Sequence, residues 1–193
     1  AGNRSLARGT TAPDVLAALG ARQWGAPLIV MTYYNVIAHL GHERFAGLAS
    51  EAGVSATIIP DLSLEEIDPW AEVADGSGIS TVMLVAPSSS PERTQRISDR
   101  SRGFVYAVAR MGVTGERAEI GDEVSQVVSK IAPTTSLPVC VGIGVSTPEQ
   151  ARQVTRVADG VVVGSALVRR LTEGAGPEGA ASFVGSLRSA IDA

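Results

Sequence analysis

Hydrophobic and polar positions alternate along the chain in two patterns. Short apolar runs rich in β-branched residues predict six strands, and the segments between them, with apolar residues three or four positions apart, predict helices. The run from Phe104 to Val108 is apolar throughout, which is typical of a strand covered on both faces in a parallel sheet. The predicted strands are PLIVMTYY from Pro27, ATIIPD from Ala56, STVMLVAP from Ser80, GFVYAVA from Gly103, LPVCVGIG from Leu137 and GVVVGSA from Gly160.

Helix start signals stand between the predicted strands. Ser63 and Glu66 form a capping-box pattern, and Pro91 and Pro148 lie where the first turn of a helix tolerates proline. One strand followed by one helix is therefore the repeating unit. Short connections between such units predict a parallel sheet with right-handed crossovers, either a barrel or a doubly wound sheet.

The C-terminal segment carries its own helical pattern. A flexible break, EGAGPE from Glu173 to Glu178, precedes a last amphipathic helix, AASFVGSLRSAI. We expect Phe183, Val184 and Leu187 of this helix to pack on the barrel.

Glycines at the ends of the last two predicted strands favour the barrel. Gly142 and Gly144 end one strand, and Gly164 and Ser165 end the next. Backbone N–H groups approach phosphate oxygens closely where no Cβ intervenes, and a (β/α)₈ barrel binds phosphate at the loops after its last two strands. A plain turn role for each glycine is the alternative. A dinucleotide-binding fingerprint fits less well, because GIGVSTPEQ lacks the spaced third glycine.

Composition and charge narrow the class of protein. With 193 residues, 45% of them hydrophobic and 19% charged, the chain is long enough for one domain with a sizeable core. The net charge of −4 and the scattered basic residues argue against nucleic-acid binding. The apolar runs are far shorter than the roughly 20 residues of a membrane span. The single Cys140 fits a reducing cytoplasm, and we interpret it as a small buried strand residue rather than a catalytic thiol.

Two histidines are candidate metal ligands. His39 and His42 are three positions apart, yet Gly41 between them argues against one helix that presents both to a metal, and no third ligand is evident. The sequence therefore predicts no metal site.

The strand ends, taken in order, resemble one known family. VMTYYN, IIPDLSLEE, LVAPSSSPER, GFVYAVARMGVTG, VGIGVSTPEQ and DGVVVGSALV look like successive strand ends of the tryptophan synthase alpha subunit, as far as about Leu171. The GVTG loop and the GSA turn are the most specific matches. The resemblance implies a (β/α)₈ TIM barrel, with about six βα units present in this chain.

The resemblance also implies an activity and a partner. The family cleaves indole-3-glycerol phosphate to indole and glyceraldehyde 3-phosphate by a retro-aldol reaction in tryptophan biosynthesis. It works in the cytoplasm within an alpha2-beta2 heterotetramer. The beta subunit of that complex carries pyridoxal phosphate, so no cofactor is expected in this chain.

Individual residues follow from the resemblance by their matching positions. The loop from Gly112 to Gly115 corresponds to one that closes over the substrate. Substrate contacts are implied for Tyr33, Tyr106, Thr114, Gly115, Gly142, Gly144, Gly164 and Ser165, and partner contacts for Asn35 and Asp61. For Asp61, an equal alternative to the partner contact is a carboxylate at the start of a helix, where the helix dipole favours it.

The family has two further strands before PLIVMTYY, which carry the glutamate that acts as general acid and base and, in the following loop, an aspartate for the indole N–H. We therefore expect 1–193 to be an N-terminally incomplete single barrel domain, with the general acid/base upstream of Ala1. We expect these residues alone to be inactive. Two other functions stay open: another phosphate-binding barrel isomerase, or a noncatalytic barrel that binds and regulates a beta-type partner.

Overall fold

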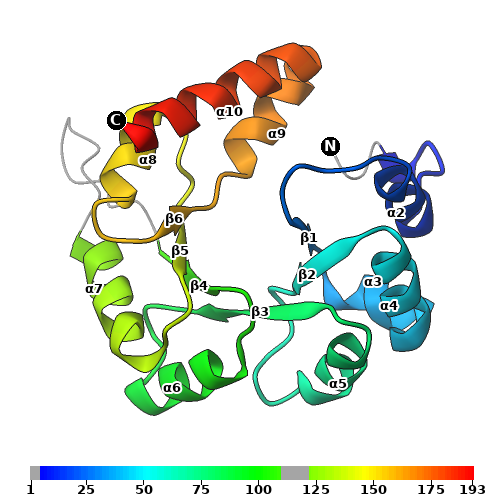
Figure 1. Ribbon diagram of the computed structural model, residues 1–193, viewed down its shortest axis with the longest axis horizontal. Helices are drawn as coiled ribbons and strands as arrows, with labels where there is room; N and C mark the ends of the chain where they lie inside the picture. The colour runs from blue at the N-terminus through cyan, green and yellow to red at the C-terminus, as the bar shows by residue number, and fades with distance from the viewer. Residues whose placement is uncertain (1–4, 110–121) are drawn as a thin grey trace. The chain divides into compact units, whose positions relative to one another are not determined.

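The computed structural model describes residues 5–109 and 122–193 (Figure 1). The chain forms two units, the first comprising Ala1–Met83 and Arg100–Gly103, the second Leu84–Asp99 and Phe104–Ala193. Parallel strands alternate with helices in both units. The prediction of one domain over 1–193 stays a prediction.

The first unit holds three parallel strands in the order of the sequence. β1 pairs with β2 and β2 with β3, without the reversal that marks a doubly wound sheet. The last two residues of β3 belong to the second unit. The elements are α2 (Ala12–Gly20), β1 (Leu28–Met31), α3 (Tyr34–Leu40), α4 (His42–Glu51), β2 (Val54–Ile58), α5 (Asp68–Gly76) and β3 (Ser80–Val85).

The second unit continues the same alternation. β4 pairs with β5 and β5 with β6, again parallel and in sequence order. α6 ends at Arg100, one residue beyond the boundary between the units. The elements are α6 (Pro91–Arg100), β4 (Val105–Val108), α7 (Asp122–Ile131), the 3₁₀ turn η1 (Ala132–Thr134), β5 (Val139–Gly142), α8 (Pro148–Val154), β6 (Gly160–Val161), α9 (Ser165–Thr172) and α10 (Gly176–Asp192).

All six predicted strands are confirmed, whereas the predicted start of the helix after β2 was wrong. Pro91 and Pro148 are the first residues of α6 and α8, as predicted. The capping-box prediction at Ser63 was wrong, because α5 begins only at Asp68. The Ser63 hydroxyl instead donates to the Glu66 carboxylate (2.9 Å) within a turn, so the side-chain pair forms without starting a helix.

An aromatic cluster forms the core of the first unit. Phe45 of α4 and Trp70 of α5 are buried and meet edge to face, with ring centroids 5.6 Å apart. The indole N–H of Trp70 donates to the hydroxyl of Thr57 on β2 (3.3 Å). This hydrogen bond satisfies a polar group that would otherwise destabilise the core.

In the second unit, side chains alternate between the two faces of β4 and β5. Val105 and Val141 are buried on one face, and α7 contacts both strands. Tyr106 and Cys140 lie on the other face and are only half-buried. The prediction that both faces of β4 are covered is therefore confirmed for one face only, since Tyr106 and Val108 on the other face are only half-buried.

The C-terminal helix α10 lies along α8 and α9 (Figure 1). Phe183 and Leu187 are buried there, as predicted, and the Arg170 guanidinium of α9 stacks 3.5 Å from the centroid of the Phe183 ring. Val184 was assigned wrongly to the packing face, since it is 48% exposed. The predicted break is also shorter than expected, because α10 begins at Gly176.

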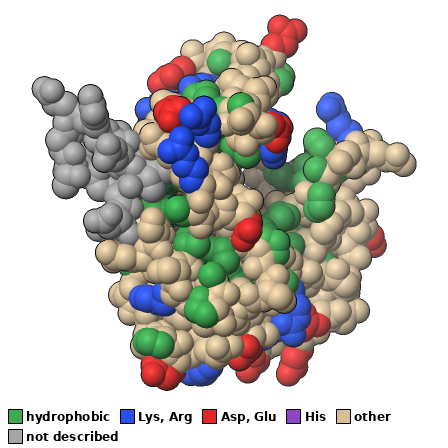
Figure 2. Space-filling view, turned by 60° about the vertical axis from the view of Figure 1, so that its left-hand side comes forward, with side chains coloured by type: hydrophobic (Ala, Val, Ile, Leu, Met, Phe, Trp, Pro, Cys, Tyr) green, Lys and Arg blue, Asp and Glu red, His purple; other side chains and the backbone are tan. Residues whose placement is uncertain are grey.

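The surface carries charges of both signs. On the face drawn in Figure 2, acidic and basic side chains are interspersed and form no basic stripe. In the two described stretches, no helix has both the length and the apolar composition that crossing a membrane requires.

Candidate functional site

Tyr106 of β4 and Gly142, the last residue of β5, form one close pair. Tyr106 is in register with Cys140, and its side chain leans over Gly142, two residues further along β5. A Cβ atom on Gly142 would overlap the phenol oxygen and lie 2.7 Å from Cε1 of Tyr106. Burial raises the pKa of the Tyr106 phenol above its usual value. The phenol is therefore neutral at physiological pH and able to donate a hydrogen bond.

Gly144 and Gly164 each follow one of two paired strands. Val141 of β5 is in register with Val161 of β6, and each glycine follows its valine by three residues. Both glycines are exposed, with nothing within 4 Å of a Cβ atom built on them. Gly144 has φ +78°, which few other residues adopt, whereas Gly164 has φ −120°. Backbone conformation thus explains glycine at position 144 but not at 164.

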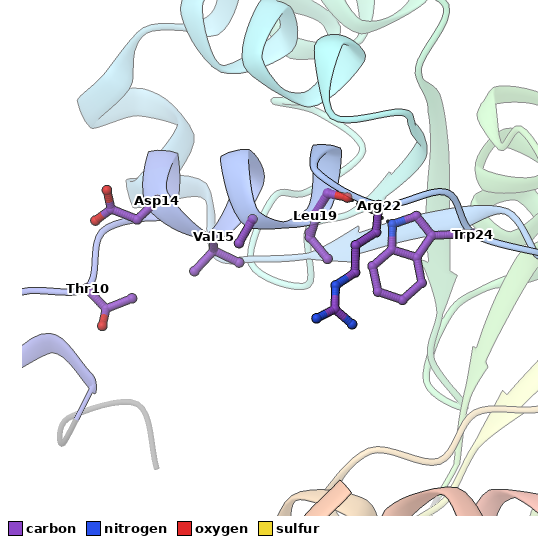
Figure 3. A pocket seen from close by; sticks show the side chains of 7 residues that line it. Thr10, Asp14, Val15, Leu19, Arg22 and Trp24 are labelled. Carbon is purple, nitrogen blue, oxygen red and sulfur yellow. Dashed lines mark hydrogen bonds between the residues drawn. The ribbon is translucent and has the colours of Figure 1, made fainter.

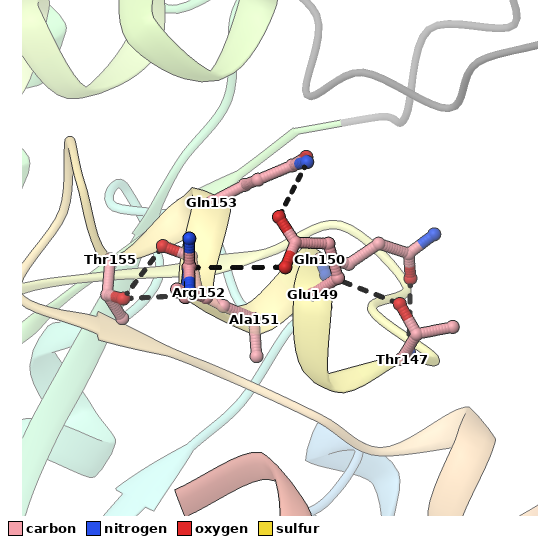
Figure 4. A network of polar contacts seen from close by, with 7 residues as sticks. All are labelled: Thr147, Glu149, Gln150, Ala151, Arg152, Gln153 and Thr155. Atoms are coloured by element: carbon pink, nitrogen blue, oxygen red, sulfur yellow. Dashed lines mark hydrogen bonds and ion pairs between the residues drawn. The ribbon is translucent and has the colours of Figure 1, made fainter. Parts of the chain in front are cut away.

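The two helices that follow these glycines differ at their N-termini. In α8, the Thr147 hydroxyl accepts from the Gln150 amide (3.3 Å), and the Gln150 side chain accepts from the amides of Ser146 (2.8 Å) and Thr147 (3.2 Å) (Figure 4). In α9, the N-cap is Gly164, with no side-chain cap and no acidic residue in the first turn. Among the described residues, therefore, no side chain caps the first N–H groups of α9, and the helix dipole favours an anion there.

In the first unit, an apolar pocket lies at the carboxyl ends of β1 and β2. It has a volume of about 360 Å³ and is lined by Met31, Thr32, Tyr33 and Pro60. The Tyr33 side chain is 65% exposed. An aromatic ring and apolar walls of this kind suit a flat apolar ligand.

Asp61 stands directly beside this pocket, and its carboxylate accepts from the amide of Tyr34, the first residue of α3 (2.9 Å). The helix-start alternative therefore holds in an altered form, because Asp61 caps a helix that precedes it in the sequence. Asn35 is exposed in the first turn of α3. Partner contacts of Asn35 and Asp61 stay predictions.

The residues predicted from the sequence thus fall into two groups. Tyr33, Asn35 and Asp61 gather in the first unit. The second unit holds Tyr106, Gly142, Gly144, Gly164 and Ser165. Thr114 and Gly115 lie outside the described residues. Sequence reasoning missed Tyr34, whose only signal was its place between Tyr33 and Asn35.

The remaining candidates have structural roles. His42 lies with its Nε2 3.0 Å from the Tyr34 hydroxyl and packs edge to face on Trp70. Within the described ranges, no three His, Cys, Asp or Glu side chains gather to hold a metal. Cys140 is half-buried, and burial, together with the charge of Asp159, raises the pKa of its thiol. A protonated thiol is a poor nucleophile, which agrees with its interpretation as a strand residue, but Cys140 is only half-buried rather than buried as predicted.

A wider hollow, of about 400 Å³, runs along α2 (Figure 3). The sequence-predicted site residues do not line it. Its wall is the outer face of α2 and the following turn, including Val15, Leu19 and Trp24, whose indole N–H donates to the Leu19 carbonyl (3.0 Å). The hollow carries one acidic and one basic residue, Asp14 and Arg22, and gathers no set of catalytic groups.

Parallel βα units in sequence order, with glycines and polar groups at the carboxyl ends of the strands, are the arrangement of (β/α)-barrel proteins. Comparison with known families gives the particular one. The family model described as "Tryptophan synthase alpha chain" matches residues 1–186. The chain belongs to this family, and its fold class is α/β, of the (β/α)₈ barrel type.

Individual relatives agree. The tryptophan synthase alpha chain of Streptomyces avermitilis is 44% identical over 171 residues, which cover 86% of this chain and 62% of the relative. That of Synechocystis sp. is 43% identical over 197 residues, covering 99% and 75%. The chain thus spans less than two thirds of the Streptomyces relative.

Solved structures show the same likeness. An open form of tryptophan synthase from M. tuberculosis superposes with a TM-score of 0.85 and 36% identity, covering 97% of this chain and 71% of that one. The tryptophan synthase alpha subunit of Campylobacter jejuni gives a TM-score of 0.86 and 28% identity, covering 95% and 73%. The resemblance predicted from the strand ends is confirmed.

Proposed function

We propose that this chain acts as a tryptophan synthase alpha chain, a lyase of tryptophan biosynthesis. The reaction is the retro-aldol cleavage of indole-3-glycerol phosphate to indole and glyceraldehyde 3-phosphate. Family membership supports the reaction class. The observation that carries the proposal is the uncapped N-terminus of α9 at Gly164, beside the exposed Gly144, because this arrangement suits a phosphate group.

The phosphate group is assigned to the second unit. Backbone N–H groups at Ser165 and the next residues have no side-chain cap, and glycine at position 164 leaves the approach open. In the neighbouring helix α8, the side chains of Thr147 and Gln150 already cap the N-terminus, so α9 is the better anion site. The matching strand ends place Gly144 on the same edge of the sheet.

The indole ring is assigned to the apolar pocket of the first unit. Met31, Tyr33 and Pro60 supply apolar and aromatic contacts there. In the reaction, a proton is added to indole C3, a proton leaves a glycerol hydroxyl, and the bond between the ring and the glycerol chain breaks. Tyr106, as a neutral phenol, would bind and orient the polar chain. Neither proton transfer has an assigned residue in the described part of the chain.

A beta subunit is the proposed partner. One of the similar solved structures is tryptophan synthase from M. tuberculosis. The membership of this chain in the alpha chain family favours an alpha2-beta2 assembly. Asn35, in the first turn of α3, and Asp61, beyond the carboxyl end of β2, are exposed and are the proposed contacts. Pyridoxal phosphate belongs to that partner, and the cytoplasm is the proposed location.

Phosphate binding is tested by calorimetric titration of the chain with inorganic phosphate and with glycerol 3-phosphate. In Gly164→Val, a branched side chain would cover the first N–H groups of α9, so we expect affinity to fall at least tenfold with an unchanged circular dichroism spectrum. Gly185→Val, at an equally open glycine in α10, is the matched control and should bind normally. Equal affinity of wild type and Gly164→Val would remove the phosphate site.

The reaction is tested by measuring indole release from indole-3-glycerol phosphate. The protein as made in the cell is assayed with and without a beta subunit. We expect release, and faster release with the partner. Binding of the substrate without any release would favour the noncatalytic regulatory barrel.

A further inference from the structure

We propose that Asp61 is a positioning residue that sets the affinity of the first unit's pocket for an aromatic ring by fixing the turn that carries Tyr33. The inference rests on the proposed function, since it concerns the pocket assigned to indole. It adds a role for Asp61 that lies within the chain, separate from any partner contact.

The Asp61 hydrogen bond joins the two segments that line the pocket. Tyr33, from the turn after β1, and Pro60, from the turn after β2, both contribute to the wall. The residues that follow them, Tyr34 and Asp61, are joined by a hydrogen bond, in which the Asp61 carboxylate accepts from the Tyr34 amide at 2.9 Å. The bond spans 27 positions of sequence and holds the two walls of the pocket together.

The turn at Tyr33 is tethered at three points. The amide of Thr32 donates to the carbonyl of Ile58 at the end of β2 (3.0 Å). The Tyr34 amide donates to Asp61, and the Tyr34 hydroxyl lies 3.0 Å from Nε2 of His42. Thr32 and Tyr34 are thus fixed on either side of Tyr33, whose own side chain is left 65% exposed at the pocket.

No side chain within the turn itself makes the hydrogen bond that the Asp61 carboxylate makes. Tyr33 is the N-cap of α3 and makes no side-chain cap bond, so the first N–H of this helix depends on Asp61. A hydrogen bond to a charged acceptor is stronger than a neutral one. Because an exposed ring has few packing contacts of its own, its direction depends on the backbone beneath it, and a fixed direction reduces the entropy lost on binding.

The test compares two probes in wild type and variants by NMR titration: indole for the pocket of the first unit, and glycerol 3-phosphate for α9. We expect Asp61→Ala to weaken indole binding about three- to tenfold, the net effect of losing one hydrogen bond, with unchanged glycerol 3-phosphate affinity. Asp61→Asn keeps an oxygen acceptor but loses the charge, so its indole affinity should fall between those of wild type and Asp61→Ala. Thr11→Ala, which removes the side-chain cap of α2 in the same unit, is the matched control and should leave both affinities unchanged.

A double-mutant cycle with Tyr33→Ala separates positioning from general loosening. If Asp61 acts through Tyr33, Asp61→Ala should weaken indole binding no further once Tyr33→Ala is present. Additive losses, or parallel losses for glycerol 3-phosphate, would overturn the proposal. Failure of the wild type to bind indole would overturn the pocket assignment and this inference together. Normal indole binding by Asp61→Ala would overturn the inference alone.

Discussion

The phenol of Tyr106 occupies the space that a side chain on Gly142 would need. A Cβ atom at position 142 would overlap the phenol oxygen, so the two residues on neighbouring strands are complementary in size. We expect Gly142→Ala to displace Tyr106 or to lower the free energy of unfolding by about 1 to 3 kcal/mol, as overpacking does. Thermal denaturation measures the loss.

The companion variant tests the cause of that loss. In Gly142→Ala/Tyr106→Ala the overlapping ring is absent, so the added methyl group should destabilise the protein much less than it does in the wild-type background. An equal cost of Gly142→Ala in both backgrounds would show that backbone conformation, rather than the phenol, requires glycine.

Burial of Tyr106 predicts a pH dependence at the alkaline end. Because burial raises the pKa of the phenol in the folded protein, the neutral form is favoured there. The resulting stabilisation is fully present below the unfolded-state pKa of about 10 and is lost as the pH rises through the folded-state pKa. Absorbance titration of tyrosinate should show one component above pH 10 that is missing in Tyr106→Phe. If the component that Tyr106→Phe lacks titrates at or below pH 10 in the wild type, this result would contradict the buried environment.

Ser165→Asp should affect stability and binding in opposite directions. A carboxylate in the first turn of the uncapped helix α9 interacts favourably with the helix dipole, which is worth about 0.3 to 1 kcal/mol. The same charge repels phosphate from this site. We expect a slightly raised melting temperature together with loss of inorganic phosphate binding. Retained phosphate affinity in a stabilised Ser165→Asp protein would place the anion elsewhere.

Phe183 should be the main anchor of α10. Its ring is buried against the Arg170 guanidinium, so Phe183→Ala removes both apolar packing and the cation–π contact and should cost about 3 to 5 kcal/mol. Arg170→Met retains an apolar chain and should cost about 0.5 to 1 kcal/mol. Urea denaturation measures both. Similar costs for Phe183→Ala and Arg170→Met would assign the docking of α10 to the guanidinium rather than to the ring.

The sequence by itself determined the order of the strands, the family and which strand ends carry glycine. Those features are local, since apolar runs and turn residues act on neighbours a few positions away. The error at Ser63 shows the limit of a local signal. Its bond to Glu66 forms as the pattern predicts, yet the helix begins at Asp68, with Pro69 in its first turn and Trp70 buried in the core.

Only the tertiary structure decided why particular residues stand at the site. Gly142 is needed because Tyr106 of another strand fills its side-chain space, and Asp61 caps a helix that lies before it in the chain. The sequence predicted the same role for Gly144 and Gly164. The structure distinguishes them, because their φ angles differ and because side chains cap α8 but not α9. Contacts between segments distant in sequence depend on how the strands pair, and no local pattern of hydrophobic and polar residues encodes them.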